Sequence, residues 1–146
     1  MGEADLLFQL DGDADVMKYI TLGIPRTMDE VIEKSMPRIL KSYQGKKDFG
    51  IFAAYLINSE KYIGWFQFEK DKEFEGSIEI GWRLKKQYWG NGYATEVATS
   101  LCELGIKMGK TIVARAMIEN LASIRVMEKA GLKFEKKFWY PDSSSP

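Results

Sequence analysis

The chain has 146 residues, which is enough for one ordinary domain and too few for two with separate cores. Lysine and arginine together number 21, as do aspartate and glutamate, and the formal charge of zero argues against broad electrostatic binding to nucleic acid or anionic membranes. The sequence has no histidine, so a Ser/His/Asp triad and a His-ligated zinc site are excluded. Acid–base chemistry then falls to carboxylates, lysine, tyrosine or water.

The cellular compartment is suggested by what the sequence lacks. One cysteine excludes an internal disulfide, and there is neither a cleavable signal nor an apolar run of membrane-spanning length. We therefore expect a soluble cytoplasmic protein without a metal site.

The first third of the chain predicts helices. Residues 4–20 are weakly patterned around a turn-like Asp-Gly-Asp and predict one or two short helices. Thr27 and Glu30 have the spacing of a capping box, so a helix is expected to begin there and run towards Tyr43. Pro37 should kink or restart this helix.

In the middle of the chain, the pattern of apolar residues changes from that of helices to that of strands. Residues 49–57, 62–69 and 76–84 are rich in isoleucine, phenylalanine, tyrosine and tryptophan, and short polar turns separate them. They predict three strands of an antiparallel meander.

The second half alternates helices and strands. It predicts, in order, a helix over 94–108 that stops at Gly109, a strand over 111–118, a helix between Asn120 and Gly131, and a strand over 132–140. The expected fold class is therefore mixed α/β (α+β), with a central mixed, mostly antiparallel sheet and helices on both faces.

The segment from Ser77 to Glu96 is the most informative about chemistry. A strand runs into a loop that contains Gly90 and Gly92, and this loop opens directly into a helix. Unpaired backbone N–H groups and the positive end of the helix dipole then meet at one point, as in pyrophosphate sites. The residues after Gly92 do not fit a P-loop. A dinucleotide fold, with Glu119 as its acidic residue, stays open as an alternative.

These residues resemble a known family. The pattern Gln87-x-x-Gly90-x-Gly92-x-Ala94 is similar to the Gln/Arg-x-x-Gly-x-Gly/Ala signature of the GNAT superfamily of N-acetyltransferases, which bind acetyl-coenzyme A. The segments 15–20, 79–82, 119–123 and 128–132 resemble the branch that acetylates the N-termini of ribosomal proteins (RimJ/RimL-like). The resemblance covers nearly the whole chain.

The resemblance implies a particular architecture. Residues 1–146 would form a single acetyltransferase domain with three layers, in which the strand at 78–84 splays away from the strand at 111–118 in a V-shaped split. Family members usually begin with a further strand and continue past the position of Pro146 into a last one, so we expect this domain to lack both.

The resemblance also implies a coenzyme site in the split. The pantetheine arm would lie there like an extra strand, bonded to the backbone around Trp82 and Leu84, and an N–H group would polarise the thioester carbonyl. The coenzyme-binding residues expected are Trp82, Arg83, Leu84, Gln87, Trp89, Gly90, Asn91, Gly92, Tyr93, Ala94, Asn120, Ser123 and Lys129.

Three residues are the catalytic candidates. Without histidine, Glu79 is the plausible base, acting directly or through water, or it positions the amine. Asn120 is expected to cap its helix, and the resemblance adds that its amide and the Ser123 hydroxyl face the coenzyme sulfur. Cys102 falls on the apolar face of its helix, which favours direct transfer in a ternary complex over an acetyl-cysteine intermediate.

The leading hypothesis is an acetyl-coenzyme A-dependent N-acetyltransferase acting on a primary amine, either a protein N-terminus or a small molecule. A non-catalytic acyl-coenzyme A-binding module shares the glycine loop and is the alternative, followed by the dinucleotide-binding protein. The expected partners are acetyl-coenzyme A and the acceptor amine, with neither nucleic acid nor membrane, in a monomer or a homodimer.

Overall fold

The computed structural model describes residues 2–43 and 49–134. Its first helix, α1, spans Glu3–Asp11 and is followed by turns, which confirms the expected short helical start. Leu7 and Leu10 of α1 pack with Met17 and Val31 in a small apolar core.

The predicted capping box is present. Thr27 Oγ1 accepts a hydrogen bond from Glu30 N, and Glu30 Oε1 accepts one from Thr27 N. Three segments continue the helix without interruption: α2 over Met28–Glu30, a π-helical turn over Val31–Ser35, and α3 over Met36–Ser42. Pro37 follows directly on the π-helical turn, in which Met36 N donates to Val31 O. The helix therefore continues through the proline after one wide turn, and the expected restart is not found.

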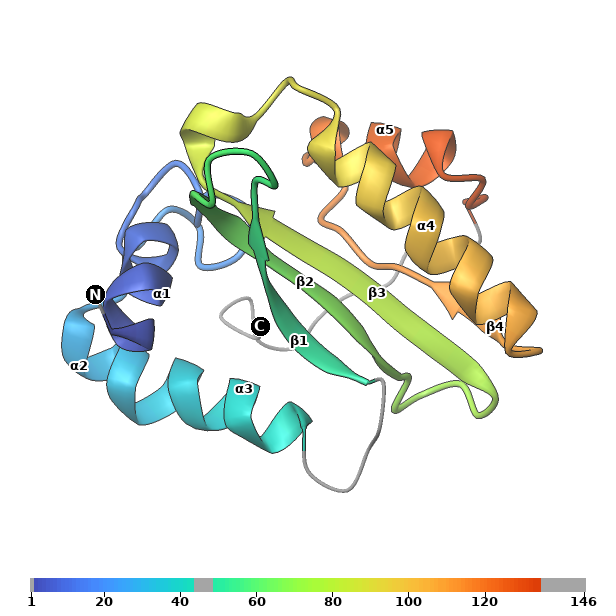
Figure 1. Cartoon of the computed structure of the whole chain (residues 1–146), viewed down its shortest axis with the longest axis horizontal. Coiled ribbons are helices and arrows are strands. Elements are labelled where there is room, and N and C mark those ends of the chain that lie inside the picture. The colour runs from blue at the N-terminus through green and yellow to red at the C-terminus, as the bar shows by residue number, and fades with distance from the viewer. Residues whose placement is uncertain (1, 44–48, 135–146) are drawn as a thin grey trace.

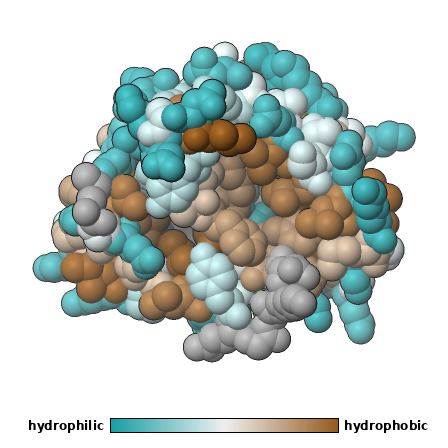
Figure 2. All heavy atoms as spheres, in the orientation of Figure 1, coloured by the Kyte–Doolittle hydropathy of each residue, from teal (hydrophilic) through white to brown (hydrophobic). Residues whose placement is uncertain are grey.

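The antiparallel meander is confirmed. It consists of β1 over Gly50–Tyr55, β2 over Tyr62–Lys70 and β3 over Ser77–Leu84, paired in this order. The edge strand β1 carries two exposed aromatic residues, Phe52 and Tyr55. Figure 2 shows hydrophobic residues gathered in the middle of this view of the molecule, with hydrophilic residues around them.

The fourth strand is much shorter than predicted. β4 spans Thr111–Val113, runs parallel to β3, and pairs with it only from Ser77 to Glu79. The expected strand over 111–118 is wrong beyond Val113, because the chain leaves the sheet there. Within the described residues, the rest of β3 pairs with β2 alone, so the two strands diverge from Glu79 onward.

Two helices cover one face of the sheet. α4 spans Tyr93–Lys107 and packs Ala98 and Cys102 on Phe68, Ile78 and Ile80. α5 spans Leu121–Lys129 and lies beside α4. Figure 1 shows α4 and α5 on one side of the sheet and α1 to α3 on the other, the expected three layers.

The ends of the second half are only partly described. Gly109 ends α4, since Gly109 N donates to Ile106 O and Lys110 N to Gly105 O, the paired bonds of a Schellman motif. The final strand predicted over 132–140 is not found at 132–134, and its remainder lies outside the described residues. No helix among the described residues is both long and apolar enough to cross a membrane.

Candidate active site

Two glycines shape the loop between β3 and α4. Gly90 and Gly92 have φ angles of 79° and 81°, in the left-handed region that other residues avoid. A Cβ added at either one would meet nothing within 4 Å, so the space beside both is open. The amide of Asn91 fixes the loop by donating to Tyr88 O and Trp89 O, both at 3.2 Å.

The loop presents a row of free backbone donors. Within the part of the chain that the structure describes, no group accepts a hydrogen bond from the backbone N–H of residues 90–95. Gly92 is the N-cap of α4 and has no side chain to cap these groups. The row therefore adds to the positive end of the α4 dipole, an arrangement that fits a pyrophosphate group.

The remaining loop residues hold the row in place. Gln87 is exposed in the 3-10 turn Lys86–Tyr88, and the Trp89 indole donates to Leu84 O at 2.9 Å. Tyr93 and Ala94 pack with Ile63 and Phe66 of the sheet. Their side chains thus anchor the helix start, which leaves their N–H groups for a ligand.

The free edge of β3 borders the divergence from β4. Lys85 N donates to Ile63 O and Asp71 N to Ser77 O. Because such bonds alternate along an antiparallel strand, Gly81 and Arg83 direct their backbone groups to β2, whereas Trp82 and Leu84 direct theirs to the open side. The backbone groups of Trp82 and Leu84 therefore lie on the open side of β3, and their side chains lie in the core.

The side chain of Arg83 lies in a different environment from those of Trp82 and Leu84. Its side chain is buried on the opposite face, where Nη1 contacts Asp11 Oδ1 at 2.7 Å and the guanidinium lies over the Trp65 ring. Burial lowers the pKa of Arg83, and Asp11 opposes this effect. The guanidinium is thus engaged with α1 and the backbone groups are directed to β2, so neither faces the open side of β3.

Glu79 lies at the point where β3 and β4 separate. Its Oε1 accepts a hydrogen bond from Gln67 Nε2 at 3.3 Å, and its Oε2 is 3.0 Å from Arg115 Nη1. Its side chain is 28% exposed, so it is accessible. Gly81 makes room for Gln67, because a Cβ there would come within 2.6 Å of Gln67 Oε1.

Arg115 and Gln67 were missed by the sequence reasoning. Arg115 Nη1 lies 2.7 Å from Asp71 Oδ1, and Nη2 lies 3.2 Å from Asp71 Oδ2. This contact holds the pKa of Asp71 below its ordinary value and raises the pKa of Arg115 above its own. The available signal was an arginine inside an otherwise apolar segment, 111–118.

The start of α5 brings two candidates together. Asn120 is the N-cap, and its Oδ1 accepts a hydrogen bond from Ser123 N at 3.2 Å, as predicted. Ser123 is half-buried in the first turn. Lys129 lies exposed in the last turn, about 9 Å from Ser123 along the helix at 1.5 Å per residue. The structure therefore joins Asn120 with Ser123 and separates both from Lys129.

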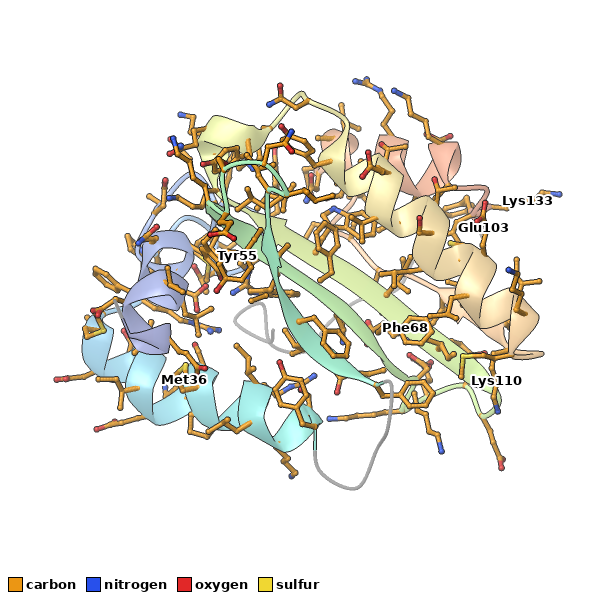
Figure 3. The ribbon with its side chains drawn as sticks, in the orientation of Figure 1. Met36, Tyr55, Phe68, Glu103, Lys110 and Lys133 are labelled. Atoms are coloured by element: carbon orange, nitrogen blue, oxygen red, sulfur yellow. The ribbon has the colours of Figure 1, made fainter. Side chains whose placement is uncertain are left out.

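The lone cysteine is part of the core. Cys102 is 5% exposed, and burial raises the pKa of its thiol. Its packing on Phe68, which is labelled in Figure 3, agrees with a structural role. Within residues 2–43 and 49–134, no three residues of the metal-binding types are grouped as a metal site would require.

Comparison with known families decides the assignment. The acetyltransferase (GNAT) domain family matches residues 2–133. The chain belongs to this family. It is an N-acetyltransferase that uses acetyl-coenzyme A, and the family assignment favours an enzyme over the non-catalytic and dinucleotide-binding alternatives.

Relatives of this GNAT chain agree. The uncharacterised N-acetyltransferase YnaD of Bacillus subtilis is 32% identical over 90% of this chain and 74% of its own length. The FsC-acetyl coenzyme A-N(2)-transacetylase of Aspergillus fumigatus is 27% identical, and the match covers 97% of this chain but 63% of the fungal protein.

Solved structures share the GNAT fold. A GNAT-family acetyltransferase of Bacillus anthracis has a TM-score of 0.78 at 29% identity, covering 98% of this chain and 82% of that one. The aminoglycoside acetyltransferase AAC(6')-Ib, solved with coenzyme A, has a TM-score of 0.73 at 23% identity, covering 97% and 86%. At that identity the likeness concerns the fold alone.

Proposed function

We propose that this GNAT domain transfers an acetyl group directly from acetyl-coenzyme A to a primary amine in a ternary complex. The observation that carries the proposal is the β3–α4 loop, with its unpaired N–H groups at residues 90–95 and its open space beside Gly90 and Gly92. The pyrophosphate of the coenzyme would bind this row. Gln87, Trp89 and Asn91 would border the phosphates, together with the backbone of Tyr93 and Ala94.

The pantetheine arm would follow the open edge of β3. Trp82 and Leu84 direct their backbone groups to this side, and Leu84 O already accepts a hydrogen bond from Trp89. An N–H group on this edge would donate to the thioester carbonyl and stabilise the oxyanion that forms during attack. Arg83 would act only indirectly, by fixing the position of β3 through Asp11, and Lys129 would meet the far end of the coenzyme.

Glu79 is the proposed base or amine-positioning group. The amine nitrogen attacks the thioester carbon, the carbon–sulfur bond breaks, and the proton lost by the amine passes to Glu79 directly or through water. Ser123, held beside Asn120, would donate a hydrogen bond to the departing thiolate. The burial of Cys102 supports this direct route over an acetyl-cysteine intermediate.

The acceptor is proposed only as a class. The resemblance to the ribosomal-protein branch favours a protein N-terminal amine, whose ordinary pKa near 8 makes deprotonation easier than for lysine. A small-molecule amine is the second candidate; the Aspergillus relative is named an FsC-acetyl coenzyme A-N(2)-transacetylase, a name that places the transfer at a nitrogen. We further propose a single domain acting in the cytoplasm as a monomer or homodimer, without nucleic acid or membrane.

The proposal is tested by calorimetric titration with acetyl-coenzyme A, and with coenzyme A, ATP and NAD as comparisons. We expect both coenzyme A forms to bind and the two other nucleotides to bind far more weakly. A screen of peptides and small amines with thiol-release detection then identifies the acceptor. Preferential binding of NAD would overturn the proposed loop assignment.

A further inference from the structure

Arg115 joins three carboxylates that come from two parts of the sheet. Its guanidinium contacts Asp71 and Glu73 in the turn between β2 and β3, and Glu79 on β3 itself. Its Nη1 is shared by Asp71 Oδ1 at 2.7 Å and Glu79 Oε2 at 3.0 Å. The same nitrogen therefore fixes a structural turn and one oxygen of the proposed base.

The groups around Glu79 would otherwise oppose its charge. Glu69 of β2 lies directly opposite Glu79 in the register, and Gln67 Nε2 bridges the two by donating to Oε1 of each. Asp71 and Glu73 add two more carboxylates from the turn. Like charges at such distances repel one another and would push the Glu79 carboxylate away, unless a cation compensates them.

Two arginines supply that compensation in different places. From α3, Arg38 contacts Glu69, with Nη2 at 2.8 Å from Oε1 and Nη1 at 3.4 Å from Oε2. Arg115, which is on the segment that follows β4, is the cation in contact with Glu79 itself. Arg38 thus neutralises the neighbour, and Arg115 neutralises the candidate base.

We propose that Arg115 is a positioning residue that fixes Oε2 of Glu79, so that the carboxylate is held in one orientation towards the acceptor amine. This inference rests on the role of Glu79 in the proposed function. Arg115 does not touch the reacting atoms; it acts through Glu79. Gln67 holds the other oxygen, so the carboxylate has a defined orientation.

The test is the effect of Arg115→Gln on kcat and on coenzyme affinity. Removal of the guanidinium should lower kcat by about tenfold or more, whereas the affinity for acetyl-coenzyme A stays unchanged. Arg115→Lys keeps a positive charge and should restore much of the loss. A purely structural role for Arg115 would lower kcat and coenzyme affinity together.

Arg38→Gln is the matched control. It removes a guanidinium from the same network, but one that contacts Glu69 and not Glu79, so kcat should fall clearly less than in Arg115→Gln. If Arg115→Gln fails to fold because Asp71 is left buried without its cation, the double variant Asp71→Asn/Arg115→Gln removes that carboxylate too. The same fall in kcat is expected in that double variant.

A second measurement separates this inference from the proposed function. Arg115→Gln is combined with Glu79→Gln, and the double variant is compared with the two single variants. Because Arg115 acts through Glu79, the second change should add little to the loss of kcat caused by the first. Additive losses would overturn the inference. Full turnover in Glu79→Gln would instead refute the role of Glu79.

Discussion

Asp11 and Arg83, which are 72 positions apart, form an ion pair of 2.7 Å between α1 and β3, with no exposure of the Asp11 side chain. Ser35 donates a hydrogen bond to Asp11, and Arg26 donates one to Ser35, so the pair also reaches the π-helical turn. This network links the helices of one layer to β3, the strand that borders the proposed coenzyme site.

Asp11→Ala should reduce the free energy of unfolding by about 3–5 kcal/mol, because it leaves Arg83 charged and buried without a partner. Urea denaturation measures the loss. Asp15→Ala is the control: Asp15 also pairs with a cation, Lys86, but both side chains are more than half exposed, and no measurable loss is expected. Equal losses in the two variants would contradict the prediction.

Gly92→Ala should weaken acetyl-coenzyme A binding about tenfold or more, since alanine is strained at this positive φ and its methyl group would enter the space proposed for the phosphates. Gly109→Ala is the matched control. Gly109 has a similar φ of 74° and equally open space at the other end of α4. Calorimetric titration of Gly109→Ala should show unchanged binding of acetyl-coenzyme A. Both variants should lose a similar amount of thermal stability.

Glu79→Gln should lower kcat by at least about a hundredfold and leave acetyl-coenzyme A affinity nearly unchanged, because the amide keeps the shape but cannot accept the proton. Steady-state thiol release and titration measure the two quantities. Glu75→Gln, a change at an exposed carboxylate of the neighbouring turn, should leave both unaltered. Loss of coenzyme binding in Glu79→Gln would contradict the assignment of Glu79 to the acceptor.

Asp71 should make the fold sensitive to acid. Its pKa is lowered in the folded state by Arg115, so its contribution to stability is fully present above the ordinary value of 3.8 and is lost as the pH falls below it. Asp71→Asn should therefore be less stable than the parent at pH 7, and the difference should shrink from about pH 4 downward. Thermal unfolding between pH 7 and pH 2 measures this, and a constant difference would contradict it.

Local signals were sufficient for much of the fold. The capping box at Thr27, the period of the three meander strands, the glycine that ends α4 and the Asn120 cap each depend on residues a few positions apart, and each was predicted. The glycine loop was likewise visible, because positive φ and a helix start leave a residue pattern.

Contacts between segments that are distant in the sequence could not be predicted from the sequence. Nothing near Arg83 in the sequence indicates that α1 supplies Asp11, and Arg115 meets Asp71 across 44 positions. The length of β4 was overestimated for a related reason. Residues 114–118 continue an apolar pattern, but a strand needs a neighbour, and β3 diverges after Glu79.

The divergence of β3 and β4 has a consequence for solvent exchange along a single strand. Gly81 and Arg83 direct their amides to β2, whereas Trp82 and Leu84 direct theirs to the open side, where the described residues include no paired strand. Amide hydrogens should therefore exchange slowly at Gly81 and Arg83 and rapidly at Trp82 and Leu84. Coenzyme binding at this edge would slow exchange at every second residue and turn an alternating pattern into a uniform one.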